Sequence, residues 1–208
     1  MRKIYFIITL TAALFTGCSK DDDIAPQQPE ATGTFVDARD NKTYHYVTYG
    51  GLDWSVENLA YDLGNEDLCI KYKPSELAET DKYDYNLLSQ IGYHYTYSGA
   101  QKAVPEGWRV PTDEEWTMLE ATHAYQLSDF NLLYAGYRNK NVSSSTHNDR
   151  FLGAWAFFWT SSKDESKTGE YYFYRKIFYS HDEMTRNSME PEACFLSVRM
   201  VREHKTNS

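Results

Sequence analysis

The chain has 208 residues, a formal net charge of −9 and an aromatic content of 16%, with 18 tyrosines. This length suffices for one domain with a sizeable core. An acidic chain without runs of Lys or Arg repels phosphate backbones, so we expect no nucleic-acid partner. The aromatic residues favour a β-rich domain, in which most tyrosines lie half-buried on sheets.

The N-terminus has the features of an export signal. Two basic residues precede an apolar stretch over residues 4–15, which is too short to span a bilayer as a helix. The sequence Phe-Thr-Gly before Cys18 resembles the lipobox of bacterial lipoproteins, with Phe15 in place of the usual Leu or Val. We therefore expect residues 1–17 to be a signal peptide and Cys18 to be lipidated. An ordinary secretory signal is the alternative.

Residues 18–33 are predicted to be a flexible acidic tether. They contain Pro and Gln and show no apolar periodicity. Lys20 and the three aspartates at 21–23 resemble the surface-export tag of lipoproteins in the Bacteroidetes phylum, with a solvated linker as the alternative. These features predict a protein that is lipid-anchored to the outer membrane and exposed at the cell surface.

Three strands separated by turns are predicted after the tether. The first, over 35–37, leads into a turn at 40–42, and residues 43–48 form the second. The glycines at 50–51 then introduce the third strand, over 52–56. This alternation predicts a short antiparallel meander.

One helix has the clearest local signal in the chain. Thr112 as N-cap with Glu115 three residues later forms a capping box, and the acidic first turn suits the helix dipole. Trp116 and Leu119 fall on one face of this helix, which we expect to span residues 113–124 and to pack on the core.

The rest of the chain alternates between apolar and polar segments. Before the helix we predict a polar loop over 66–84 and one or two helical turns over 97–103. After it we predict strands over 132–138, 156–161, 171–179 and 195–201, with polar loops at 139–149 and 162–169. A helical middle followed by antiparallel strands predicts a single α+β domain over 34–203, with a polar tail over 204–208.

Several sequence motifs occur in a recognisable order. They are W-x-x-E-N-L at 54–59, P-x-G-W-x-x-P-T-x-x-E-W at 105–116, A-G-Y-R at 135–138, F-W-T-S-S at 158–162 and S-V-R at 197–199. Together they resemble the Fibrobacter succinogenes major paralogous domain over residues 34–203. The resemblance implies a C-type-lectin-like or formylglycine-generating-enzyme-like fold with mostly antiparallel strands and one or two helices. It also implies a secreted or surface lipoprotein of unassigned activity.

The residues inside these motifs are interpreted as structural. The tryptophans are expected to anchor the core, and Glu57 and Arg109 to form ion pairs or caps, with ligand contact as the alternative. The complete set is Trp54, Glu57, Asn58, Trp108, Arg109, Thr112, Glu115, Trp116, Trp159 and Arg199.

Cys69 and Cys194 remain once the lipidated cysteine is set aside. In an exported protein such a pair is a candidate disulfide, with two free thiols as the alternative. The family commonly has two further cysteines, at places that here hold Val104 and Met200. Because both are absent together, we expect an apolar Val–Met contact to fill the site of a lost disulfide.

No catalytic pattern is evident in the sequence. It contains no His-Glu-x-x-His, nucleotide-binding glycine loop or nucleophile elbow. The segment 190–192 resembles a lectin calcium motif but departs from it at the third position. We therefore expect no enzyme activity, metal or cofactor. The expected function is a binding module that recognises a glycan or a protein through the loops at 139–149 and 162–169. The alternative is a structural or accessory subunit of a cell-surface assembly.

Overall fold

The computed structural model describes residues 25–72, 85–140 and 149–205. The signal peptide, Cys18 and the acidic run at 21–23 lie outside these residues. The regular structure of the described part is mostly antiparallel strands, in four sheets, with three α-helices, which confirms the α+β class. We had expected one or two helices. Within the described ranges, no helix is both long and apolar enough to cross a membrane.

The first sheet contains the N-terminal meander and the last strand of the chain. Its strands, in sheet order, are β1 (Ala31–Asp37), β2 (Lys42–Tyr49), β3 (Leu52–Ser55) and β12 (Val201–Glu203). The turns occur where predicted, and Asn41, Gly50 and Gly51 adopt positive φ there. Gly33 leaves room for the Tyr46 ring of the paired strand, which would have to shift if a Cβ stood there.

The predicted tether ends earlier than expected. Ala31 to Gly33 pair with β2, so these three residues belong to the sheet and not to a flexible segment. Just before them, the Glu30 carboxylate accepts a hydrogen bond of 2.7 Å from the Gly50 N–H. Strand β1 therefore begins at Ala31 because its backbone finds partners in β2.

The second sheet lies on the other side of the molecule. Its strands, in sheet order, are β10 (Thr185–Met189), β9 (Tyr172–Phe178) and β8 (Trp155–Lys163). The predictions for β8 and β9 are confirmed, and residues 156–160 of β8 are buried. The sequence analysis missed β10, because its residues are mostly exposed and polar and show no apolar alternation.

Two smaller sheets lie near the second one. They pair β4 (Cys69–Ile70) with β5 (His94–Tyr95), and β6 (Tyr137–Asn139) with β11 (Cys194–Phe195) and β7 (Asp149–Arg150). The predicted strand over 132–138 is mostly wrong. Its backbone is irregular up to Gly136, whose N–H donates to the Trp155 carbonyl.

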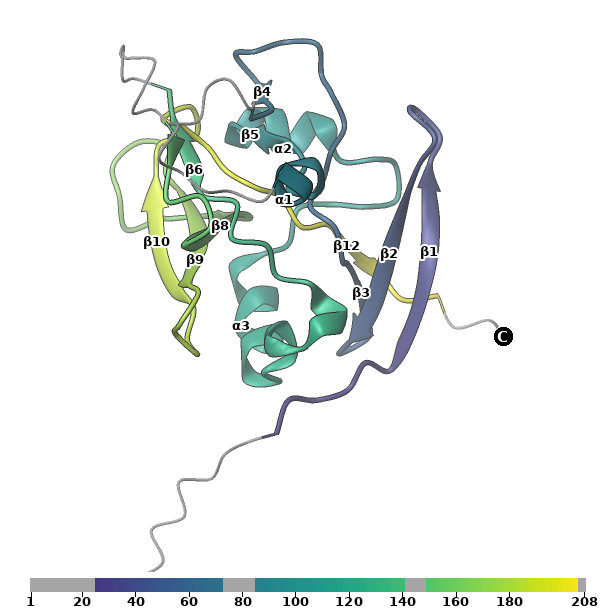
Figure 1. Ribbon diagram of the computed structural model, residues 1–208. Coiled ribbons are helices and arrows are strands. Elements are labelled where there is room, and N and C mark those ends of the chain that lie inside the picture. The colour runs from purple at the N-terminus through teal and green to yellow at the C-terminus, as the bar shows by residue number, and fades with distance from the viewer. Residues whose placement is uncertain (1–24, 73–84, 141–148, 206–208) are drawn as a thin grey trace, which may run out of the picture.

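The C-terminal segment crosses the molecule from the second sheet to the first (Figure 1). Leu196 bridges to Tyr95 of β5, and Ser197 bridges to Phe158 of β8. Five residues on from Leu196, Val201 begins β12 and pairs with β3. The single strand predicted over 195–201 is therefore replaced by two short strands, because this segment changes neighbours along its length.

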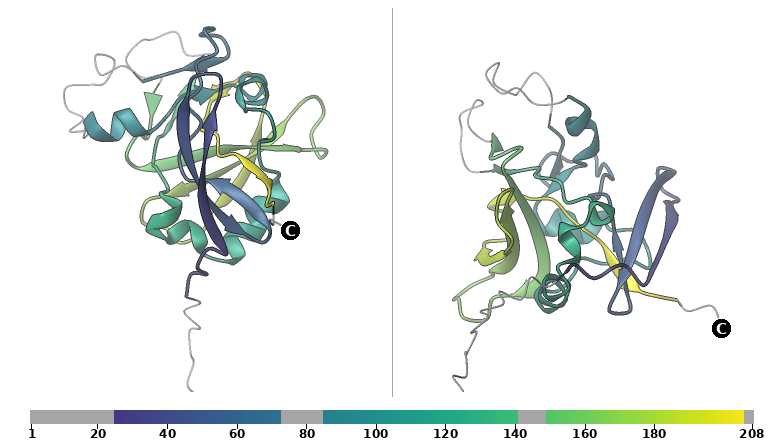
Figure 2. Two further views of the ribbon diagram at one scale, coloured as in Figure 1. Left: turned by 90° about the vertical axis from the view of Figure 1, so that its right-hand side faces the viewer. Right: turned by 60° about the horizontal axis from the view of Figure 1, so that its bottom comes forward.

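Three α-helices are described, and the last of them lies between the two larger sheets (Figures 1 and 2). They are α1 (Tyr85–Gln90), α2 (Tyr97–Ala103) and α3 (Asp113–Ala121). Both hydrogen bonds of the predicted capping box begin α3, and the helical turns predicted over 97–103 correspond to α2. Helix α3 ends three residues before the predicted position, because His123 adopts a left-handed conformation with φ of 52°.

The core is rich in packed aromatic rings. The Trp116 ring lies 4.9 Å from that of Trp54 in an edge-on contact and is stacked 5.2 Å from that of Phe158, so α3 joins both larger sheets. In a second cluster, half-buried Val104 packs against a group that includes Met200. The two positions at which the resemblance predicts the site of a lost disulfide thus belong to one apolar cluster.

Candidate functional site

The motif residues form a structural frame. Trp54, Trp116 and Trp159 are almost fully buried, and Trp108 is buried beneath the β1–β2 hairpin, where its ring stacks 4.1 Å from that of Phe35. The indoles of Trp54, Trp116 and Trp159 are sealed from any ligand, whereas Trp108 packs on Phe35 and also lines a cavity of about 420 Å³. These tryptophans therefore contribute packing.

Arg109 and Glu115 lock the start of α3. The Arg109 guanidinium donates two hydrogen bonds, of 2.7 and 2.5 Å, to the Glu115 carboxylate. The same carboxylate accepts the Thr112 N–H at 2.8 Å. Burial raises the pKa of Glu115, but these hydrogen bonds outweigh it and the net shift is downward. The motif thus couples a helix cap to a bidentate ion pair.

Arg199 is a fully buried cation held by backbone carbonyls. Its guanidinium donates to the carbonyl of Ser55 at 2.9 Å, to that of Asn131 at 2.6 Å, and to that of Val56. It also lies 4.9 Å from the centre of the Phe130 ring. Burial lowers its pKa to about 9, so the group is still protonated at neutral pH. Arg199 thereby ties the end of β3 to the segment after α3.

A buried Asn58, His94 and Ser197 cluster resembles a catalytic triad only in composition. The Asn58 amide donates to the Ser197 hydroxyl at 3.3 Å, and the His94 ring lies 3.5 Å from that hydroxyl and 3.1 Å from the Ala135 carbonyl. All three side chains have no exposed surface. Burial lowers the pKa of His94 to about 4, so the ring is neutral. A sealed cluster cannot reach a substrate, and its role is structural.

This buried imidazole predicts a loss of stability in acid. The folded-state pKa lies below the ordinary value of 6.5, so the unfolded chain binds the proton more readily as the pH falls below 6.5. His94 alone should reduce the free energy of unfolding by about 2 kcal/mol between pH 7 and pH 5. Imidazole NMR titration checks the pKa directly. Protonation of His94 near pH 6.5 in the folded protein would contradict the assignment.

Cys69 and Cys194 are free and buried, so the alternative of two free thiols holds and the candidate disulfide does not form. Cys69 pairs with Tyr95 of β5, and Tyr95 pairs in turn with Leu196. A strand therefore separates Cys69 from the segment that carries Cys194. Two strand spacings amount to roughly 10 Å, which exceeds the reach of about 7 Å between the Cα atoms of a disulfide.

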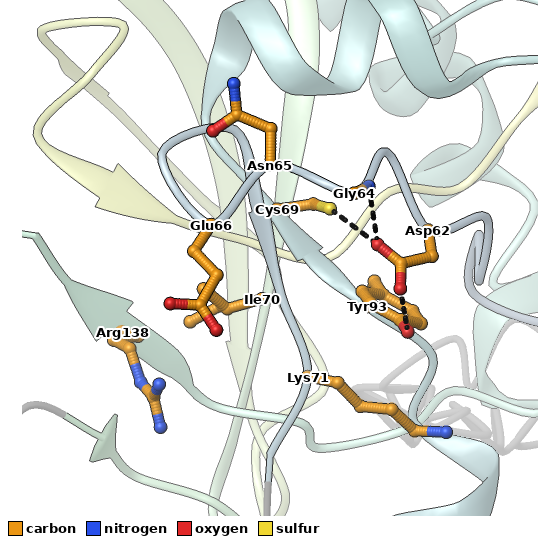
Figure 3. A pocket seen from close by; sticks show the side chains of 9 residues that line it. All are labelled: Asp62, Gly64, Asn65, Glu66, Cys69, Ile70, Lys71, Tyr93 and Arg138. Atoms are coloured by element: carbon orange, nitrogen blue, oxygen red, sulfur yellow. Dashed lines mark hydrogen bonds between the residues drawn. The ribbon is translucent and has the colours of Figure 1, made fainter.

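A polar cavity of about 380 Å³ lies where β4, β5 and β6 meet (Figure 3). Its lining combines two carboxylates, an amide, a thiol, an ammonium group, a guanidinium and a tyrosine ring. The residues are Asp62, Gly64, Asn65, Glu66, Cys69, Ile70, Lys71, Tyr93 and Arg138. Figure 3 shows Glu66 and Arg138 on one side of the cavity and Asp62 with Tyr93 on the other.

Turn chemistry shapes the wall of this cavity. The Asp62 carboxylate accepts the Gly64 N–H at 2.7 Å, and the Asn65 side chain accepts the Asp67 N–H at 2.9 Å. Gly64 itself has a positive φ of 64°. These Asx turns fold the segment back on itself before β4 begins, so its polar side chains converge on the cavity.

The electrostatics of the cavity suit binding better than nucleophilic chemistry. The Gly64 N–H, with a 3.0 Å hydrogen bond from the Tyr93 hydroxyl, lowers the pKa of Asp62 and keeps it ionised. Burial, together with this bond, raises the pKa of Tyr93 to about 12. Burial also raises the pKa of Cys69, so its sulfur remains a thiol, which is a poor nucleophile. The cavity therefore presents fixed hydrogen-bonding groups of both charges.

This cavity is not predicted by the sequence. The polar, irregular pattern of residues 66–84 predicts only a loop, and no spacing links that loop to Tyr93 or Arg138. The loop expected to bind at 139–149 lies mostly outside the described residues. The other expected loop, at 162–169, lines no part of the cavity, and its Asp164 accepts hydrogen bonds from Ser166 and Ser188 instead.

In the described part of the chain, no group of three or more His, Cys, Asp or Glu side chains could hold a metal ion. No curated protein and no solved structure matches the chain. Residues 47–129 match the family described as the Fibrobacter succinogenes major domain. The matched range includes β3, the cavity segment at 62–71, Tyr93 and the capped helix α3. This range is the part of the chain that is similar to the Fibrobacter succinogenes major domain family.

Proposed function

We propose that this protein is a lipid-anchored binding module of the cell surface, and that the cavity at β4, β5 and β6 takes a polar ligand, of which a glycan is the first candidate. The mixed lining of the cavity carries the proposal. Its volume of about 380 Å³ falls within the range of small-ligand sites. Carboxylate and amide oxygens can accept hydrogen bonds from sugar hydroxyls, and the cationic groups can donate to them.

The finer fold assignment belongs to the same proposal. We infer a C-type-lectin-like arrangement, which is supported by the Arg109 to Trp116 helix start and by the terminal strand β12 soon after Arg199. A rigid scaffold that holds ligand groups on loops suits a non-enzymatic module.

Exposed charges at the rim of the cavity test the binding proposal. Glu66 and Lys71 are exposed, so Glu66→Gln with Lys71→Gln should leave the fold intact. The double variant should bind an oligosaccharide selected on a glycan array at least about tenfold more weakly, because two charge-assisted hydrogen bonds are lost. Isothermal titration calorimetry checks this.

The matched control is Glu165→Gln with Lys167→Gln, which removes the same two charges from the exposed loop at 162–169. A loss of affinity in the control alone would move the site to that loop. If no oligosaccharide binds and the full-length protein instead co-purifies with a stoichiometric surface protein, the alternative of an accessory subunit is favoured.

The membrane anchor is tested separately. Cys18→Ser should release the protein from the membrane fraction, because the sulfur that carries the lipid is absent. Wild-type protein should incorporate radiolabelled palmitate and be digested when protease is added to intact cells. Replacing residues 20–23 by alanine should protect it from that digestion. Palmitate labelling of the Cys18→Ser protein would refute the lipidation site. If the alanine variant is digested as readily as wild type, residues 20–23 act only as a linker.

A further inference from the structure

A strip of aromatic rings, none of which lines the cavity, runs from the end of β7 onto the second sheet. It contains Phe151, Trp155, Phe178 and Tyr179, whose successive ring centres are 6.4, 5.0 and 4.6 Å apart. Trp155 and Phe178 face each other across β8 and β9. The side chains at its two ends are among the most exposed large hydrophobic residues described, with Phe151 50% and Tyr179 60% exposed. Contiguous exposed aromatic surface of this kind marks interaction sites.

Phe151 is held in an unfavourable backbone conformation. Its φ of 65° lies in the left-handed region, which a bulky side chain rarely adopts. The phenyl ring of Phe151 lies in the strip and is half exposed, so its partial burial contributes little to the free energy of unfolding. Backbone strain of this kind is concentrated at functional sites, where a residue is retained because its side chain contacts a ligand or partner.

The charge of the strip indicates the chemistry of its partner. The Lys176 ammonium lies 5.1 Å from the centre of the Trp155 ring, and it forms no ion pair with any described residue. On the opposite face of the same strand, Arg175 is paired with both Asp113 and Glu120. Of these two cations of β9, the one without an ion pair thus lies beside the exposed rings. An anionic ligand would complement it, whereas a second copy of this acidic chain would bring net repulsion.

We propose that this strip binds a glycan chain that carries carboxylate groups. The apolar C–H faces of the sugars would stack on Phe151, Trp155 and Tyr179, and a carboxylate would pair with the Lys176 ammonium. This surface is separate from the cavity at β4 and β5, so the proposal goes beyond the small polar ligand proposed there.

Oligogalacturonate and its methyl ester are suitable probes, because they share the same sugar rings and differ in charge. The full mature protein should bind oligogalacturonate more tightly than the ester. Tyr179→Ala and Phe151→Gly should each weaken that binding about tenfold. Lys176→Gln should abolish the preference for the acid over the ester while leaving affinity for the ester unchanged.

Two controls separate binding from folding. Val36→Ala and Met118→Ala truncate the other two large exposed hydrophobic residues of the described ranges, which are 57% and 58% exposed, and should leave binding unchanged. Phe151→Gly also relieves the positive φ, so its melting temperature should stay within about two degrees of wild type while its affinity falls. A ring with a merely structural role would lower both.

Three results would overturn the proposal. One is the absence of binding to either probe at millimolar concentration, and another is equal binding by wild type and the Tyr179 and Phe151 variants. The third is a wild-type dimer in sedimentation that Tyr179→Ala converts to a monomer, since a second copy would then cover the strip. Each of these would leave the cavity proposal standing, because its test uses Glu66 and Lys71.

Discussion

Replacing Arg199 by methionine is expected to lower the free energy of unfolding by roughly 3 kcal/mol or more. The substitution leaves the carbonyls of Ser55, Val56 and Asn131 buried without their common donor. It also relieves the desolvation of a buried charge, which offsets part of the loss. The orphaned carbonyls dominate because a buried acceptor without a partner costs about 1–3 kcal/mol, and three are affected.

Urea denaturation followed by tryptophan fluorescence measures this difference. Arg186→Met is the matched control, because the Arg186 side chain is 54% exposed and its partner Asp113 keeps Arg175. That change should cost less than about 1 kcal/mol. Equal effects of the two substitutions would mean that the three carbonyls find other donors when Arg199 is absent.

Truncation of Trp116 is expected to cost about 3–5 kcal/mol, whereas loss of the helix cap in Thr112→Ala should cost about 1 kcal/mol. Trp116 is fully buried against Trp54 and Phe158, so alanine leaves a large cavity where α3 meets both sheets. Thr112 loses only one hydrogen bond, of 3.1 Å, to the Glu115 N–H.

The difference in melting temperature between the two variants shows how much more the Trp116 indole contributes than the Thr112 cap. Thermal unfolding monitored by circular dichroism should place Trp116→Ala far below Thr112→Ala, with wild type highest. Small and similar effects would show that α3 contributes little packing between the sheets. A larger effect of Thr112→Ala would make the cap, and not the indole, the main support of the helix.

Local signals in the sequence predicted local structure well. The capping box of Thr112 and Glu115 and the turn at Gly50–Gly51 were predicted correctly, because each depends on residues a few positions apart. The end of α3 was wrong by three residues because His123, a residue without a strong breaking signal, adopts a left-handed conformation.

Contacts between distant residues could not be predicted in the same way. The cavity joins Asp62 to Tyr93 and Arg138, and no periodicity relates these positions. The two remaining cysteines suggested a disulfide by their number and compartment alone, but β5 lies between their segments. Strand β10 was missed because its packing partners, and not its own residues, make it a strand.

The path of the C-terminal segment has a consequence for the order of folding. Strand β12 covers the edge of β3, and Arg202 pairs with Asp53, 149 positions earlier in the sequence. The family match ends at residue 129, so the matched piece lacks the strand that completes its own sheet. Closing so long a loop costs conformational entropy before the contacts between its ends can form. Folding is slow because this cost comes first. A nascent chain has to reach residues 201–203 before the β3 edge is covered, and until then that edge is open to pairing with other chains.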